Sequence, residues 1–573
     1  MKKINKLILM TSALLAGASA FAQDFGDFGE FEDDASGSAA STLEVSGGAD
    51  LDLRGYVDVD DPAADKIEIE ATPSAYIDLK YSGNNSDLEL NLKLDEDTIK
   101  NHPEDVIDEA VLRGRLGDYF TIETGKMKIV WGKGDKLHVL DNFNADDYSD
   151  FIIPDYLDRR ISTPMVRGIV SLPVANLNIE GVYTPFLPVD RFATEGCWTP
   201  AQVDALTGTV TEGAAKRLTA CTTQLETIRL EAAEASALKD LATAGNAEAL
   251  TALTKMVTNA FVSGKISYTN EEVAAVLMKM GVNPLAATDA QKLAAAKSVL
   301  AEKYESYLKD SLTAAETDYT LCLANANALS ANPDVIYPDL WTLKYGQYGA
   351  RATWTLGQVD MGISYYNGWF KQPSVNASKI NSFLVSYLAN GEVAEDEKFL
   401  AYDKKQTFGL EASTVLWHFN VRGEFAYNLT DDVDGTDPWV HNNSIAWLGG
   451  FDIDLPFWNA NLNVQEIGSF ILNGSECDKN KADVDYGVNG YTNNKIAVNL
   501  TASFMNDKVA PEVTVMYGIE NKDLAVMPKL SYKADQNLTL TASGMYIWCG
   551  DDNSEFKAWE KNSFVSLGAS YQF

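Results

Sequence analysis

Apolar and polar residues alternate along most of this chain. Between residues 43 and 54, for example, Leu51 and Leu53 alternate with Asp50 and Asp52. One apolar and one polar face over about 10 residues is typical of a transmembrane β-strand, whereas strands of soluble sandwiches most often have roughly 5–6 residues. The pattern therefore predicts an all-β, antiparallel transmembrane barrel.

Eighteen segments carry this alternation, and a barrel of 16 strands is also compatible with it. The even-numbered connections between them are turns of a few residues, whereas the odd-numbered ones are nearly all long, as is the rule for bacterial barrels. If the N-terminus is periplasmic, the long loops face outward. The segments are 43–57, 66–81, 86–95, 106–116, 118–128, 164–173, 176–185, 342–356, 358–370, 406–417, 418–429, 443–455, 459–470, 493–505, 509–518, 521–533, 536–548 and 563–573.

The longest connection changes character over residues 190–338, where aromatic residues become sparse and Ala, Leu, Thr, Glu and Lys dominate. These include strong helix formers, and Thr269 followed by Glu272 is a helix start. We expect about four helices in an insertion between barrel strands 1–7 (residues 43–189) and 8–18 (residues 339–573). The insertion either stands outside as a cap or host-facing domain, which we favour, or plugs the lumen.

Two segments precede the first strand. Residues 1–22 combine Lys2 and Lys3 with a short apolar run and end in Ala-Phe-Ala, which predicts a cleavable signal peptide. That run is too short to cross a bilayer as a helix. Residues 23–42 form an acidic leader rich in small residues. We expect the leader to be disordered, because it cannot bury a core.

The last segment resembles the terminal β-signal of outer-membrane proteins, which the barrel assembly machinery reads. It places Gly568, Tyr571 and the final residue Phe573 in an alternating strand. The resemblance implies a location in the cell outer membrane, with its lipid and the assembly machinery as partners.

The charge balance narrows the function classes. The net charge is −36, from 82 acidic and 46 basic residues. This balance argues against nucleic-acid binding, which needs a basic surface. Beyond residue 22 no run of 18 apolar residues occurs, so a helical inner-membrane protein is excluded. The acidic excess fits charges that face water in a lumen and in long loops.

The third long connection, residues 129–163, mixes acidic and aromatic residues. From Trp131 to Arg160 it resembles an uncharacterised family of large Gram-negative outer-membrane barrels, with Trp-Gly at its start, an Asp-x-x-Asn core and Asp-Arg near its end. General porins fold their third extracellular loop into the lumen as a constriction. Because this connection is also the third outward loop, we expect the same arrangement here.

Five arginines are expected to point into the lumen: Arg113, Arg115, Arg167, Arg351 and Arg422. One hypothesis is that they form a basic ladder facing the aspartates of the infolded loop, because opposed charges at a constriction set ion selectivity. The alternative is that they balance lumen carboxylates such as Glu109 and Glu424 and keep the lumen wet. The loop aspartates are Asp141, Asp146, Asp147, Asp150, Asp155 and Asp158.

All five cysteines fall in outward connections, where disulfides are chemically permitted. We expect Cys477 to pair with Cys549, and either Cys221 or Cys197 to pair with Cys322, which leaves one thiol over. No metal site or cofactor is predicted. The acidic loop around Gly435 has hard oxygen ligands but does not match a full calcium-binding loop.

These features favour a porin-like channel for passive diffusion of small hydrophilic solutes, compatible with an oligomer. The alternative is an adhesin or host-interaction barrel that uses the helical insertion. The chain has only four histidines and contains no nucleophile-elbow, metalloprotease or phosphate-loop motif. We therefore do not expect an enzyme.

Overall fold

The computed structural model describes seven stretches of the chain. The predicted signal peptide, residues 23–41 of the leader, Asp155 and Asp158 lie outside them. Contacts divide the chain into two compact units, a barrel unit and a helical unit, which comprises Ala205–Pro338 and Asn376–Phe399. The described residues are 42–57, 69–135, 137–150, 159–194, 196–477, 491–552 and 554–573.

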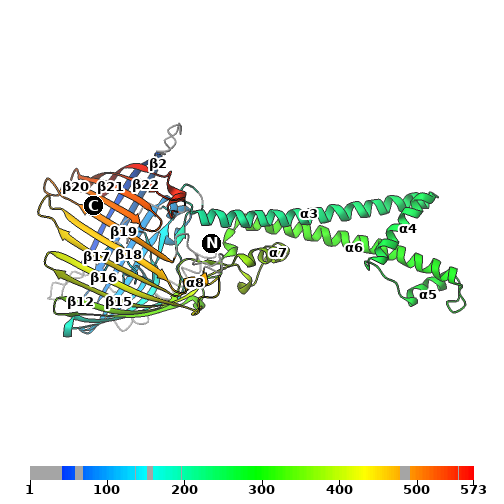
Figure 1. The fold of residues 1–573 in the computed structure, drawn as a ribbon, viewed down its shortest axis with the longest axis horizontal. Helices are drawn as coiled ribbons and strands as arrows, with labels where there is room; N and C mark the ends of the chain where they lie inside the picture. Colours follow the sequence, from blue (N-terminus) through cyan, green and yellow to red (C-terminus); the bar gives the residue numbers. More distant parts are fainter. Residues whose placement is uncertain are drawn as a thin grey trace, which may run out of the picture. The chain divides into compact units, whose positions relative to one another are not determined.

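Eighteen antiparallel strands form a single closed sheet (Figure 1). Each strand pairs with the next along the chain, and the last pairs with the first from Gly48↔Gln572 to Tyr56↔Phe564. The predicted antiparallel barrel is confirmed, with 18 strands rather than 16. The strands are β1 (Thr42–Tyr56), β2 (Ile69–Ser82), β3 (Ser86–Asp95), β4 (Ile107–Leu116), β5 (Phe120–Met127), β8 (Thr163–Leu172), β9 (Leu177–Thr184), β11 (Gln347–Leu356), β12 (Val359–Trp369), β15 (Lys404–Leu416), β16 (Phe419–Thr430), β17 (Ser444–Asp454), β18 (Asn461–Ile471), β19 (Thr492–Thr501), β20 (Val509–Gly518), β21 (Asp523–Lys533), β22 (Leu538–Cys549) and β23 (Phe564–Gln572).

The outer face of the barrel is apolar. Leu53 and Leu567 are 43% and 61% exposed, whereas Arg54, the next residue after Leu53, is 6% exposed. Closure pairs the strand amides and carbonyls without leaving an edge, which is what lipid requires of a sheet. A closed barrel of even strand number with an oily outer face is an outer-membrane structure.

Tight turns join strands at one side of the barrel. Gly117 between β4 and β5 and Gly357 between β11 and β12 have φ values of +65° and +66°, which glycine adopts without a steric penalty. Trp417 between β15 and β16 takes a φ of +57° as a non-glycine residue and is 91% exposed.

Smaller elements lie in the connections of the barrel. The loop between β5 and β8 contains β6 and β7, which form a three-stranded sheet with β10. The elements are α2 (Glu96–Lys100), β6 (Ala145–Tyr148), β7 (Arg160–Ile161), β10 (Arg191–Phe192), β13 (Ser374–Val375), β14 (Leu400–Ala401) and α8 (Gly474–Cys477).

The helical unit is built on two long helices, α3 (Ala201–Thr243) and α6 (Asp289–Ala331). Within it, α4 (Ala247–Val262) and α5 (Asn270–Lys279) lie at one end of this pair and α7 (Ile380–Asn390) at the other (Figure 1). The insertion therefore contains the expected four helices. No helix in the described stretches is long and apolar enough to span a bilayer.

Local sequence fixes the starts of α5 and α6 in this unit. Thr269 caps α5 and exchanges hydrogen bonds with Glu272, as its sequence predicts. Thr288 and Gln291 form the same capping box at α6. One of the unit's apolar cores surrounds the buried Leu308.

Candidate functional site: an infolded loop and a charged barrel wall

The described residues of the loop between β5 and β8 (128–135, 137–150 and 159–162) include a group that packs inside the barrel. Its side chains Trp131 and Phe143 are fully buried and share an apolar cluster with Val111 of β4, Tyr366 of β12 and Ala426 of β16. The Phe143 ring contacts Trp131 and Tyr366 edge-on at centroid distances of 5.0 and 5.1 Å. Because β4 lies five strands away from β12 and seven from β16 around the ring, one cluster can join them only in the space that the barrel encloses.

The carboxylate of Glu424 anchors this loop to β16. Its Oε1 accepts hydrogen bonds from the Lys133 and Gly134 amides, both at 2.7 Å. Its Oε2 accepts from the Val139 amide at 2.8 Å and the Leu140 amide at 3.3 Å. The Glu424 side chain is completely buried. A buried charge is tolerated when it is fully hydrogen-bonded, and this ring of amides supplies the partners.

The glycines of the Trp-Gly-Lys-Gly segment make this wrapping possible. Gly132 has a φ of +118°, and a Cβ there would lie 2.3 Å from Glu424 Oε1. A Cβ on Gly134 would lie 1.9 Å from the Leu137 carbonyl oxygen. His138 completes the cradle, with Nδ1 at 3.1 Å from Glu424 Oε1. The motif quoted from the sequence is therefore a cradle for a carboxylate.

The same loop reaches the opposite wall. Asp150 lies 3.0 Å from the Arg54 guanidinium near the end of β1. In ring order β16 is the eleventh strand, so ten steps separate it from β1 in one direction and eight in the other. One loop thus contacts nearly opposite walls.

Other loop aspartates are also paired. Asp141 lies 2.8 Å from Arg160, and both side chains are almost fully buried. Asp147 lies 2.8 Å from Arg191, which also holds Asp105 at 2.7 Å. Burial opposes ionisation of Asp105, but the neighbouring Lys126 and Arg191 outweigh it and lower the pKa of that carboxyl. Asp146 lies 3.6 Å from Arg159.

The arginines of the barrel wall pair with wall carboxylates. Arg113 lies 2.6 Å from Glu123, which also pairs with Arg167 at 3.1 Å. Arg167 pairs in turn with Glu180.

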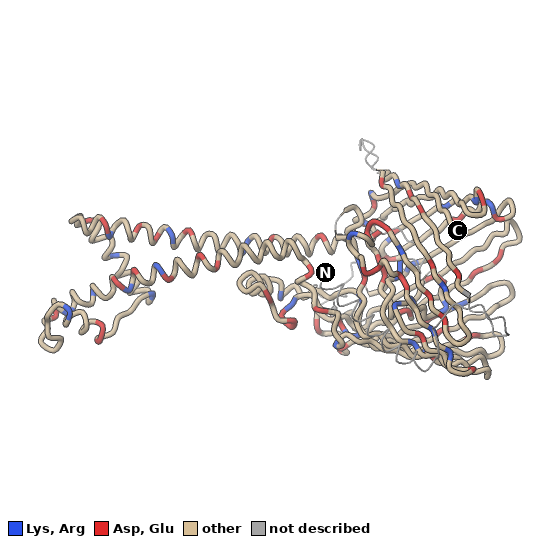
Figure 2. Tube along the Cα trace, turned by 180° about the vertical axis from the view of Figure 1, so that it is seen from behind, with Lys and Arg blue, Asp and Glu red and all other residues tan. Residues whose placement is uncertain are grey.

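The chain of charges continues on both sides. Arg115 pairs with Asp87 on β3, and Arg351 lies 2.6 Å from Glu411 and 3.9 Å from Glu180. Figure 2 shows acidic and basic residues interspersed along the barrel strands. We call this row of ion-paired side chains the charge belt. It comprises Asp87, Arg113, Arg115, Glu123, Arg167, Glu180, Arg351 and Glu411.

The described contacts therefore place the wall arginines and most of the loop aspartates in separate ion pairs. Two wall arginines are exceptions. Arg54 pairs with Asp150 of the loop, and Arg422 pairs with Asp452 on the wall and with Asp135 of the loop. The sequence analysis did not select Asp135 as a site residue. Its position directly after Gly132-Lys133-Gly134 could have indicated that it lies in the loop that packs against the wall. Glu123, Glu180 and Glu411 were also missed, although the alternation that selected the arginines selects them too.

The terminal strand forms the seam of the barrel. Tyr571 lies opposite Ala49 and Gly568 opposite Asp52. The Phe573 amide donates to the Gly47 carbonyl at 3.0 Å. The predicted assembly signal therefore occupies the strand that closes the sheet, and its recognition by assembly machinery stays a prediction.

The predicted disulfide partners divide between the two units. Cys221 of α3 and Cys322 of α6 are buried free thiols, and the Cys322 side chain helps to raise the pKa of Cys221. Cys197 and Cys549 belong to the barrel unit. Nothing is described of the Cys477 side chain, so its pairing with Cys549 stays a prediction.

One cluster combines a hydroxyl, a carboxylate and an imidazole. His441 Nδ1 lies 2.6 Å from Asp403 Oδ2, and Ser374 Oγ donates to Asp403 Oδ1 at 3.1 Å. An activated serine needs its hydroxyl on the imidazole, whereas here the hydroxyl is on the carboxylate. The cluster instead ties together two connections, the one between β12 and β15 and the one between β16 and β17.

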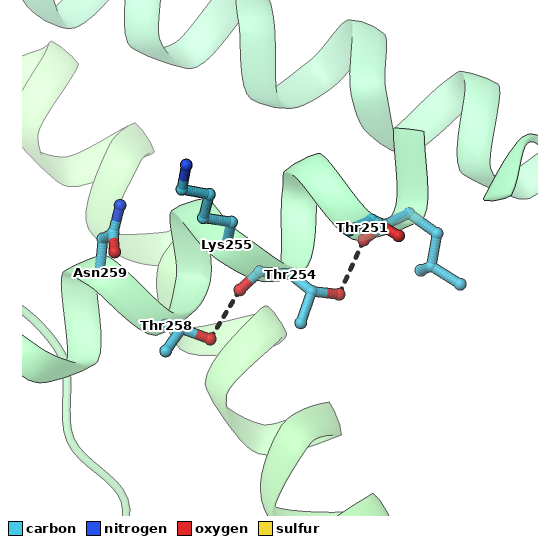
Figure 3. A pocket seen from close by; sticks show the side chains of 6 residues that line it. Thr251, Thr254, Lys255, Thr258 and Asn259 are labelled. Atoms are coloured by element: carbon cyan, nitrogen blue, oxygen red, sulfur yellow. Dashed lines mark hydrogen bonds between the residues drawn. The ribbon is translucent and has the colours of Figure 1, made fainter. Parts of the chain in front are cut away.

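A shallow pocket lies on α4 in the helical unit (Figure 3). Its threonine hydroxyls donate to backbone carbonyls one turn earlier, as Thr258 does to Thr254 at 2.7 Å. These hydroxyls are engaged within the helix, so the pocket offers little directed polar chemistry. It is lined by Leu250, Thr251, Thr254, Lys255, Thr258 and Asn259.

No protein-family model and no curated protein matches the chain. Among solved structures it is similar to OccAB4 of Acinetobacter baumannii, at 8% identity over 94% of this chain and 98% of that one, with a TM-score of 0.39. It is also similar to a BenF-like porin from Pseudomonas fluorescens Pf-5, at 9% identity over 94% of this chain and 98% of that one, with a TM-score of 0.39. For OccK11 of Pseudomonas aeruginosa the identity is 7% over 93% of this chain and 96% of that one, with a TM-score of 0.38. At such low identities and scores, these similarities carry no argument about function.

Proposed function

We propose that this protein is a passive diffusion channel for small hydrophilic solutes, narrowed by the infolded loop of residues 129–163. The observation that carries the proposal is the reach of this loop, from Arg54 on β1 to Glu424 on β16. A barrel of 16 to 18 strands leaves an aqueous bore. A loop attached at nearly opposite walls of such a bore constricts it.

Charge pairing sets the expected selectivity. The charge belt contains four arginines and four carboxylates, so it carries no net charge. Opposed charges at a constriction orient polar solutes and bias ion passage. Neutralising Arg113, Arg115 and Arg167 together would leave their carboxylates in excess. We expect this triple variant to shift the reversal potential in a bilayer recording toward cation preference.

Liposome swelling with purified protein tests the channel itself. Vesicles that contain the protein should swell in small sugars, with rates that fall steeply as sugar size grows. Vesicles reconstituted with heat-denatured protein are the control. Swelling no faster than in that control would contradict a diffusion channel.

A second candidate function is surface interaction through the helical unit. The observation in its favour is that this unit has its own apolar cores and leaves large apolar side chains exposed, with Met278 at 61%, Met280 at 55% and Leu285 at 96%. Replacing residues 205–338 by a short Gly-Ser linker should abolish cell binding and preserve solute flux. Unchanged binding would discard this candidate.

The seam strand suggests a partner for biogenesis. We infer that the barrel assembly machinery engages β23, because the residues of the terminal signal lie in it. Truncating Tyr571–Phe573 should leave the protein out of the outer membrane, as fractionation would show. Normal insertion would contradict this inference.

A further inference from the structure

The long helix α3 of the helical unit buries few apolar side chains for its length. Over its 43 residues α3 buries only Val210, Cys221, Leu225 and Ala235. Three ion pairs link α3 to α6: Arg217–Asp318 at 3.6 Å, Arg229–Glu316 at 3.0 Å and Lys239–Glu305 at 2.7 Å. The side chains of the first pair are about one third exposed, and those of the other two are about half exposed or more. Exposed ion pairs contribute little to stability. Small folding units with limited cores depend on additional covalent or metal links.

Cys221 and Cys322 occupy the point where such a link would form. Each is 1% exposed and is a free thiol in the structure, and Cys322 is a direct neighbour that raises the pKa of Cys221. The cross-helix pairs Arg217–Asp318 and Arg229–Glu316 lie on either side of Cys221 along α3. The two helices run antiparallel there, because the partner of the later α3 residue comes earlier in α6.

We infer that Cys221 and Cys322 form an interhelix disulfide that clamps α3 to α6. Both thiols lose a proton and one electron each, the sulfur–sulfur bond forms, and the disulfide of a protein thiol oxidant is reduced to a dithiol. Such oxidants operate outside the inner membrane, where disulfides persist. The inference depends on export of the chain and not on the channel function.

The state of the thiols sets when oxidation occurs. Burial raises the pKa of Cys221 to about 12, with the Cys322 and Asp318 side chains acting in the same direction. The thiolate is the reactive form in disulfide exchange. Oxidation therefore takes place before α3 and α6 pack together and bury the two thiols.

Peptide mapping of the full-length protein tests the clamp. Outer membranes are dissolved in denaturant with a maleimide, which blocks every thiol not already in a disulfide, and are digested with trypsin. Cleavage after lysine and arginine gives peptides 218–229 and 310–344. We expect these two peptides to be recovered as one linked species that separates on reduction.

Variants and outcomes are defined by the same map. Cys197→Ser should retain the linked species, and Cys221→Ser should remove it and leave Cys322 alkylated. Recovery of Cys221 and Cys322 alkylated in wild-type protein, or linked to other cysteines, would overturn the inference. The wild-type map does not depend on any variant folding, and liposome swelling tests the channel proposal separately.

Discussion

The two units of this protein use leucine in opposite ways. Leu410, in the middle of β15, is 55% exposed, whereas Leu308 on α6 is 6% exposed. The barrel satisfies its backbone between strands and turns its oily side chains outward to lipid. The helical unit satisfies its backbone within each helix and turns its oily side chains inward. An exposed leucine of the barrel thus faces lipid, whereas an exposed leucine of the helical unit faces water and is a potential contact surface for a partner.

Leu308→Ala should produce the largest effect, confined to the helical unit. Loss of a buried leucine costs about 2–5 kcal/mol, and this core is small. Helical circular dichroism should melt at lower temperature, while the migration of the folded barrel on an unheated gel stays the same. Leu293→Ala on the same helix, where the leucine is 58% exposed, is the matched control. Equal effects of the two changes would contradict the core assignment.

Leu410→Arg should destabilise the barrel and spare the helical unit. An arginine facing the bilayer midplane costs about 2–4 kcal/mol in such barrels. Urea unfolding in lipid vesicles measures this cost, with Leu410→Phe as the control that keeps the site apolar. A cost near zero would show that this face does not meet lipid.

Arg167→Gln should affect conduction more than stability. It removes the shared partner of Glu123 and Glu180, and a buried acceptor left without its partner costs about 1–3 kcal/mol. The ratio of cation to anion permeability should rise several-fold in bilayer recordings. Arg229→Gln, in an exposed pair of the helical unit, should leave the ratio unchanged. A permeability ratio equal to wild type would discard the charge belt as a determinant of selectivity.

Thr269→Ala should have the smallest effect. It removes the capping box of α5, and loss of a cap costs about 1 kcal/mol. The helical unit should unfold at slightly lower denaturant concentration. Thr313→Ala is the control, because that hydroxyl bonds only to the Lys309 carbonyl within α6. An equal or larger loss in the control would contradict the capping role.

The strands could be predicted because the side-chain period of two reports directly which face meets lipid. The segments 86–95 and 509–518 coincide with β3 and β20. The anchor of the infolded loop could not be predicted, because Gly134 and Glu424 are 290 residues apart in the chain. Their contact depends on where each strand stands in the closed ring, and local pattern carries no information about that.

The ion pairs of the barrel wall could be predicted from the sequence only in part. Alternation put Arg113 and Glu123 on one face, but their contact follows from the register of β4 and β5, in which they are opposite each other. For the same reason the sequence left Cys197 and Cys221 as candidate partners of Cys322. The antiparallel packing of α3 and α6 favours Cys221, which is the pair inferred above.

The most direct test of the infolded loop compares single-channel conductance of wild-type protein, Glu424→Gln and Glu411→Gln. A glutamine at 424 turns an N–H group toward the loop amides, so the loop should loosen and give a larger, flickering conductance. Glu411 pairs with Arg351 on the wall, so its variant should change the ion selectivity but keep a steady conductance without flicker. A steady, unchanged conductance in Glu424→Gln would contradict a constriction held by this carboxylate.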